Sequence, residues 1–460
     1  MAEIVILGSG LTGLCTAYHL EKRGFFDFKI FEKENISGGL LRSFYQDNFT
    51  FDFTGHLLHI NNNQFRDFIE NISGLNKFNY IQRKSFIYLN QNFTPYPFQT
   101  NLANLSPKII IDSIDGFVNR KKNIKKPKSF YHWVLKYFGK GMGKYFFFNY
   151  NKKLLSYDIK KITSSWTGRF IPQTNLQAIL SSVLNNKDQT NIGYNNHFYY
   201  PKNDGIMYLI NKLTKSIKTK THTLHNATKI NLKTKTINFE NGHKEKFKTL
   251  INTTPLNTFL KSLDGNSSLS LNNASKKLLC NSVLNFNLGF NVANLSNKHW
   301  IYFPETKYSF YRIGFWQNFS LNSVKKNCSA IYGEISYIPG TKTSRQILNL
   351  KKKAIDQTLK IWGLNENNIV TQNNLILPHA YVIYDFWREK NLKKIHSILN
   401  KLSIHSVGRY GEWKYSSMQE AFLDGKKTAE LILKKLNKIP PHKNTTNFIF
   451  NKKDNKSETL

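Results

Sequence analysis

Cysteine and acidic residues are scarce in this chain of 460 residues. Its three cysteines, Cys15, Cys280 and Cys328, are spaced neither as a disulfide framework nor as a zinc site. The opening MAEIVILGSG lacks the basic head and cleavage region of a signal peptide, and no apolar run reaches the roughly 18 residues of a membrane span. We therefore expect a cytoplasmic protein from a reducing compartment and predict no metal site.

Acidic residues number only 29 against 66 lysines and arginines, which gives a net charge of +37. Such an excess favours anionic partners, either phosphorylated small molecules or acidic lipid head groups. The lysines are spread along the whole chain, so we predict no nucleic-acid binding. The same spread also fits a compositional bias, and peripheral membrane contact and the oligomeric state remain open.

Hydrophobic residues make up 40% of the chain, enough for a large core, and the length favours two or three domains. Helical patterning runs through residues 101–187 and again through 417–436. Strand patterning occupies 228–232, 236–239, 249–253, 282–291 and 329–337, with a turn signal at Asn241-Gly242. Beyond residue 438 the chain becomes polar and basic, which predicts a flexible tail.

The first 32 residues have the pattern of a dinucleotide-binding unit. An apolar strand at 4–7 runs into Gly8-x-Gly10-x-x-Gly13, a patterned helix and a second apolar strand at 28–31. The glycines permit a tight turn, close approach of the backbone to a pyrophosphate, and close packing of helix on strand. Glu32 follows the second strand, near the spacing of a carboxylate that accepts from ribose hydroxyls.

Two further glycine turns extend this pattern. Gly38-Gly39-Leu40 comes soon after Glu32, with Arg42 beyond it to meet phosphates, and the turn at 408–411 precedes the C-terminal helix. This order resembles the FAD-binding amine oxidases, protoporphyrinogen oxidases and sugar-nucleotide mutases. The resemblance implies FAD as cofactor and an α/β fold, a Rossmann-like FAD-binding domain (GR2-type) with a mixed α+β substrate domain.

The resemblance also implies a division of the chain. We expect the FAD-binding domain to be discontinuous, with the cap mostly helical and the second substrate domain rich in strands. The expected boundaries are 1–95, 200–262 and 400–437 for the FAD-binding domain, 96–199 for the helical cap, 263–399 for the β-rich domain and 438–460 for the basic tail.

Longer blocks of sequence resemble one particular group within this large family. The blocks TGHLLH, TPYPFQTN, KPKSFYHW, YFPETKYSFYR and GRYGEWKY occur in the order found in UDP-galactopyranose mutases, especially the eukaryotic type. The segments 166–170 and 198–201 are closer to bacterial protoporphyrinogen-oxidase-like relatives. The resemblance implies conversion of UDP-galactopyranose to UDP-galactofuranose, in which N5 of reduced flavin attacks the anomeric carbon, UDP leaves and later returns, and no net electrons move.

The site residues implied by these blocks fall into three sets. A guanidinium suits a diphosphate because it forks two oxygens at once, and a histidine beside the flavin can accept or relay a proton. The implied catalytic residues are His56, Arg312 and Arg169. The implied substrate ligands are Gln99, Asn151, Arg169, Arg312, Tyr381, Arg409 and Tyr415. The implied cofactor ligands are Gly8, Gly10, Gly13, Glu32, Gly39, Leu40, Arg42, Gly55, His56, Gly408, Tyr415 and Met418.

Two departures from the mutase pattern keep alternatives open. Leu155 stands where the mutases carry a tryptophan, and the segment 416–420 is closer to the oxidase-like relatives. One alternative is an FAD-dependent oxidase or desaturase, which needs an apolar or amine-accepting pocket. Another is a flavin-bound interaction protein without turnover.

Overall fold

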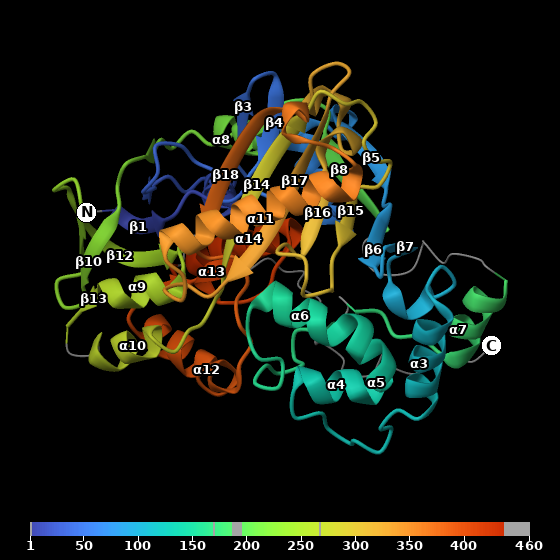
Figure 1. The fold of residues 1–460 in the computed structure, drawn as a ribbon. Helices are drawn as coiled ribbons and strands as arrows, with labels where there is room; N and C mark the ends of the chain where they lie inside the picture. The colour runs from blue at the N-terminus through green and yellow to red at the C-terminus, as the bar shows by residue number, and fades with distance from the viewer. Residues whose placement is uncertain (1, 169–170, 186–195, 266–267, 437–460) are drawn as a thin grey trace.

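The computed structural model describes residues 2–168, 171–185, 196–265 and 268–436, and its first layer is a mixed sheet of eight strands (Figure 1). β1 (Ala2–Leu7) pairs in parallel with β2 (Phe28–Phe31) and β12 (Lys244–Asn252). The apolar run Ile4 to Leu7 of β1 is fully buried, as expected for a central strand covered on both faces. The remaining strands are β9 (Thr221–His222), β10 (Ala227–Asn231), β11 (Thr236–Phe239), β13 (Leu263–Asp264) and β19 (Ile404–Ser406).

Helices from both ends of the chain pack together against this sheet. α1 (Leu11–Glu21) is buried over most of its length and lies against α14 (Met418–Lys435). A Cβ added at Gly425 of α14 would lie 2.8 Å from both the Cys15 Cβ and the Thr12 carbonyl oxygen, so a glycine is needed for this contact. The other helices of this part are α2 (Asn63–Ser73), α8 (Met207–Lys215), α9 (Leu256–Ser262), α10 (Ser268–Ser275), α12 (Phe386–Lys401) and α13 (Gly408–Gly411).

A seven-stranded sheet forms the second layer, in the order β18-β14-β17-β16-β15-β6-β7. Its central strands are buried on both faces, and its outer face is covered by α11 (Ser344–Trp362). The strands are β6 (Ser85–Leu89), β7 (Asn92–Pro95), β14 (Ser282–Phe290), β15 (Trp300–Tyr302), β16 (Arg312–Phe315), β17 (Ser329–Tyr337) and β18 (Ile369–Leu377). Two short pairs add β3 (Ser43–Gln46) with β4 (Phe49–Asp52) and β5 (Phe78–Gln82) with β8 (His197–Pro201).

A third region is helical and occupies the lower right of Figure 1. Its core is aromatic, with Phe98, Phe130, Phe138 and Phe147 among the buried side chains. The helices are α3 (Pro107–Val118), α4 (Phe130–Tyr137), α5 (Gly139–Met142), α6 (Phe148–Leu155) and α7 (Leu176–Leu184).

The α/β fold class and the predicted elements are confirmed within the described residues. The strand–turn–helix–strand opening, the hairpin turned at Asn241-Gly242 and the C-terminal helix all form, and the described part of 101–187 is largely helical. The domain boundaries stay a prediction, and the predicted tail lies outside the described residues. Among the described residues, no helix is long and apolar enough to cross a membrane.

The crossing of α3 and α5 yields a stability prediction. A Cβ added at Gly141 would lie 1.8 Å from the Asp112 carbonyl oxygen, and no side-chain rotation can relieve a backbone clash. We expect Gly141→Ala to lower the free energy of unfolding by about 1–3 kcal/mol in urea titration. Gly168→Ala is the control, because its added methyl meets none of the described residues within 4 Å. Equal stability of the two variants would contradict the close packing.

Candidate active site

A single cavity of about 1210 Å³ reaches from the glycine turn after β1 to the facing strands β16 and β17. Its walls come from the first sheet, the second sheet and helix α6 of the helical region. Segments distant in sequence therefore contribute to one site, and the cavity is large enough for an extended ligand with a second molecule beside it.

The glycine turn forms one end of this cavity. Gly8 has φ of +98°, and a Cβ at Gly13 would lie 2.0 Å from the Gly8 carbonyl oxygen, so both positions require glycine. Gly10 caps α1 without any side-chain acceptor for the amides of the first turn. The first-turn amides therefore have no side-chain cap and, together with the helix dipole, can serve a phosphate.

Glu32 lies at the end of β2 and lines the same end of the cavity. Its Oε2 accepts from the Ser9 backbone N–H at 2.8 Å and from the Ser9 hydroxyl at 3.0 Å, while Oε1 accepts from the Glu34 N–H. The buried carboxylate is thus fixed against the glycine turn. Its contact with a ribose stays a prediction.

The second glycine turn lies directly against the first. A Cβ at Gly39 would lie 3.3 Å from the Gly10 Cα, so the two backbones approach closely. Arg42 donates from Nε to the Gly39 carbonyl at 2.8 Å, and its Nη1 lies 3.4 Å from Glu34. This arginine supports the turn and also faces the cavity.

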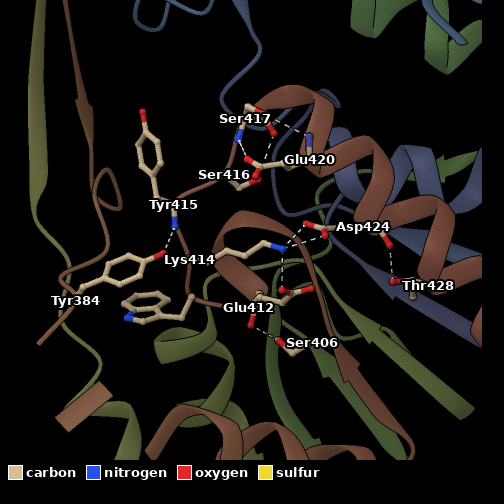
Figure 2. Close-up of polar contacts among 12 residues, drawn as sticks. Tyr384, Ser406, Glu412, Lys414, Tyr415, Ser416, Ser417, Glu420, Asp424 and Thr428 are labelled. Carbon is tan, nitrogen blue, oxygen red and sulfur yellow. Dashed lines mark hydrogen bonds and ion pairs between the residues drawn. The ribbon is translucent and has the colours of Figure 1, made fainter. Parts of the chain in front are cut away.

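A half-buried ionic cluster holds the chain between α13 and α14 (Figure 2). Lys414 Nζ lies 2.8 Å from Glu412 and 2.9 Å from Asp424. One residue on, the Tyr415 backbone N–H donates to the Tyr384 hydroxyl at 2.7 Å. These contacts fix the backbone that carries Tyr415 at the edge of the cavity.

Arg312 faces the cavity from β16 as half of an ion pair. Its Nε and Nη2 donate to the two oxygens of Glu334 on β17, at 2.6 and 2.7 Å. Burial opposes the charge of Arg312, but the Glu334 carboxylate raises the pKa of the guanidinium well above its usual value. The fork uses one edge of the guanidinium, and Nη1 makes no hydrogen bond with any described residue.

Arg409 and two tyrosines form the facing wall. Arg409 donates to the carbonyls of Ser416 and Ala380, and its guanidinium lies 4.9 Å from the Tyr415 ring centroid. The Tyr415 ring stacks on Tyr381 at 6.3 Å. Burial raises the pKa of Tyr381 to about 12, against the opposing effect of Arg312, so its hydroxyl remains a donor at neutral pH.

His56 lies between this wall and the glycine turns and is neutral. Burial lowers its pKa to about 3, and the charges of Arg409 and Arg312 lower it further. The Thr54 hydroxyl lies 3.2 Å from Nδ1 and orients the ring. A neutral imidazole in this place can accept or donate one hydrogen bond to a ligand.

Most of the residues predicted from the sequence line this cavity. They are Gly8, Gly10, Glu32, Gly39, Leu40, Arg42, Gly55, His56, Asn151, Arg312, Tyr381, Arg409, Tyr415 and Met418. Gly13 and Gly408 lie behind the lining, where Gly408 packs on Thr12. Gln99 is buried and also lies outside the lining, with its amide donating to the Pro172 carbonyl at 2.6 Å. Arg169 lies outside the described residues.

The sequence did not single out several residues of this wall: Arg83, Tyr150, Tyr302, Tyr311 and Glu334. Tyr302 and Tyr311 belong to the block 302–312, and Tyr302 pairs directly with Arg312 across β15 and β16. That block could have indicated them. Glu334 has no such signal, because its pairing with Arg312 depends on the register of β16 on β17.

The neutral state of His56 gives a pH prediction. Unfolded, its imidazole takes up a proton near pH 6.5, whereas the folded state resists protonation until about pH 3. Stability from this group is complete above 6.5 and falls with falling pH, by up to about 1.4 kcal/mol per unit. Urea unfolding between pH 6.5 and 4.5 should show a shallower slope for His56→Gln than for the parent. Identical slopes would show that folding does not lower the pKa of His56.

Comparison with known proteins agrees with this architecture. A structure of reduced UDP-galactopyranose mutase superposes with a TM-score of 0.88 at 24% identity, covering 94% of each chain. An Exiguobacterium sp. 255-15 protein assigned as a protoporphyrinogen oxidase superposes with a TM-score of 0.72 at 15% identity. A putrescine oxidase variant superposes with a TM-score of 0.63 at 11% identity. Each of these two comparisons covers 94% of this chain and 99% of the other. These likenesses establish the fold. The family model of the flavin containing amine oxidoreductases matches the sequence over residues 11–359. This chain therefore belongs to that family, and its cofactor is FAD.

Proposed function

We propose that this protein is a mutase that interconverts the pyranose and furanose forms of a nucleotide sugar, with UDP-galactopyranose as the substrate. One observation carries the proposal. Arg312, Arg409, Tyr381 and Tyr415 converge on the same cavity as the dinucleotide-binding glycine turns. The fold likeness to a UDP-galactopyranose mutase at a TM-score of 0.88 supports it.

The residues at the glycine end fit the diphosphate of FAD. The uncapped amides of α1 and the close backbone approach at Gly39 leave room for phosphates beside the backbone, and Glu32 is placed at the ribose side. When bound and reduced, FAD supplies the nucleophile for this chemistry. The protein's own groups then have to bind the sugar carrier, orient it and exclude water.

Arg312 and Arg409, on facing walls of the cavity, suit the diphosphate of the substrate. A diphosphate in a buried site needs cations and hydrogen-bond donors together, and guanidinium groups supply both. Glu334 takes up one edge of Arg312 and so holds the remaining Nη1 toward the cavity. Arg409 adds a second positive charge, and the tyrosine hydroxyls add neutral donors. Arg169 as a further ligand stays a prediction.

The sugar would lie between this wall and His56. Asn151 lines the cavity from α6, with its amide donating to the Phe147 carbonyl at 2.8 Å, and its oxygen can accept from a sugar hydroxyl. Aromatic side chains line this part of the cavity, among them Tyr150, Tyr302 and Trp166, and would exclude water from the bound sugar. Neutral His56 can hold a hydrogen bond to the reacting pair without adding charge.

The family match favours one competing function, an FAD-dependent oxidase or desaturase. A free carboxylate in the cavity would favour a cationic amine as substrate. The acidic residues that line the cavity in the described part of the chain are Glu32, Glu34 and Glu334, and each already has a partner. The positive charges of Arg312 and Arg409 would repel a cationic amine, and this repulsion favours the mutase.

Turnover separates the two functions. Purified protein is incubated with UDP-galactopyranose, and the products are separated by chromatography before and after reduction with dithionite. The mutase predicts UDP-galactofuranose from the reduced protein alone, with no change in the sugar's oxidation state. Hydrogen peroxide formed in air from an amine, with no furanose product, would establish the oxidase instead.

Arg312 provides the matching binding prediction. We expect Arg312→Ala to weaken UDP binding by about 2–5 kcal/mol in calorimetry, because the diphosphate loses a buried charge partner. The same change leaves Glu334 buried without its partner, so Arg312→Ala/Glu334→Gln serves as the control for folding. That double variant should keep its FAD while UDP affinity stays low. Recovery of UDP affinity in the double variant would remove Arg312 from the diphosphate site.

A further inference from the structure

One stretch of the chain has a charge distribution unlike the rest. Residues 116–157 contain eleven lysines and arginines and no aspartate or glutamate. The averages of the whole chain, 66 basic and 29 acidic in 460 residues, would give about six and three in a stretch of this length. A bias shared by the entire sequence therefore does not explain this segment.

The cations of this stretch gather on an exposed loop. Lys121, Lys122, Lys125, Lys126 and Lys128 lie between α3 and α4, and all five are exposed. None of them pairs with a carboxylate of the described residues, unlike Lys414 or Lys29 elsewhere in the fold. We call these five residues the basic loop. Its charge is available to an anionic partner.

Apolar side chains are exposed beside the basic loop. Val118, the last residue of α3, is 49% exposed, and Ile111, two turns earlier on the same side of the helix, is 64% exposed. Of the carboxylates of α3, Asp112 accepts from the Tyr145 hydroxyl and lies 3.7 Å from Lys144, whereas the exposed Asp115 accepts from the neutral amide of Asn119 and keeps its charge. Val118 thus comes three residues before the first lysine of the basic loop, and Ile111 continues the exposed apolar side along α3.

We propose that the basic loop and the exposed face of α3 dock this protein on an anionic phospholipid surface. Lysines near a bilayer attract acidic head groups, while aliphatic side chains enter the boundary between head groups and acyl chains. Sites for single-stranded nucleic acid add aromatic stacking platforms, and residues 119–128 contain no aromatic residue. A lipid surface therefore fits this face better than a nucleic acid.

The location of the surface fits a docking role. Figure 1 shows α3, α4 and α5 at the end of the molecule away from β1 and β10. The same helical region contributes Phe146, Tyr150 and Asn151 to the cavity wall. Docking through the basic loop would hold the cavity near the membrane without covering the glycine turns. The proposal is independent of the substrate.

Vesicle sedimentation tests the proposal on the full-length, FAD-loaded protein. We expect binding to vesicles that contain phosphatidylserine, little binding to pure phosphatidylcholine, and loss of binding as salt rises. K121E/K122E/K125E/K126E should weaken binding by at least about tenfold. The matched control is K325E/K326E/K352E/K353E, which makes the same charge change at four exposed lysines elsewhere and should bind nearly as the parent does. Unchanged FAD content in both variants shows that they fold.

Several outcomes would overturn the docking surface. Equal loss in the two charge variants would mean that only net charge matters, and equal binding to both kinds of vesicle would exclude head-group recognition. Binding to RNA or heparin without binding to vesicles would assign the surface to another polyanion. I111S/V118S leaves the charge unchanged, so several-fold weaker vesicle binding is expected from lost apolar contact, and unchanged binding would remove α3 from the surface.

Discussion

The wall of the cavity that carries Arg312 depends on one buried ion pair, that of Arg312 with Glu334. Glu334 is 1% exposed, and an unpaired carboxylate at such a depth costs several kcal/mol. The pair therefore couples β16 to β17 in the centre of the second sheet. It also presents the outer edge of the guanidinium to the cavity in a fixed orientation. A long flexible side chain thereby becomes a preorganised ligand, and little side-chain entropy remains to be lost on binding.

The opposite wall is built by a different means. Arg409 lies in the short helix α13, and Tyr415 lies on the connection between α13 and α14, where regular hydrogen bonding is absent. The Lys414 cluster and the Tyr384 hydroxyl supply the missing support, as do the carbonyls that hold Arg409. The two walls thus come from a sheet interior and from a braced connection. Both leave polar groups facing one cavity.

Burial first, and neighbouring charge second, lower the pKa of His56 and keep it neutral. Two arginines near a buried imidazole make protonation unfavourable, so this part of the cavity gains no third positive charge. The excess of lysine elsewhere acts differently. Most lysines are exposed and screened by salt, and their effect on the fold is small. In residues 116–157, which contain no acidic residue, the exposed lysines are not offset by carboxylates of the same stretch and form a positively charged surface instead.

Sequence alone determined the local elements of this protein. The glycine turns could be predicted because steric limits act on neighbouring residues: Gly8 needs positive φ, and Gly13 lies within 2.0 Å of a backbone oxygen. A continuous apolar run likewise predicted β1, and helical periodicity predicted α14. Strand patterning with a turn signal predicted the hairpin at Asn241-Gly242. The longer blocks indicated Arg312, Tyr381 and Arg409 through a family resemblance.

Only the tertiary structure decided how these groups meet. Glu334 has no sequence signal, since its partnership with Arg312 follows from strand register across a sheet. Gln99 belongs to an indicated block, but it lies behind the lining, and its amide donates to the carbonyl of Pro172, which does line the cavity. The pKa of His56 depends on two arginines more than 250 residues away in the chain. Register, burial and through-space charge arise from contacts between distant segments, which local patterns do not specify.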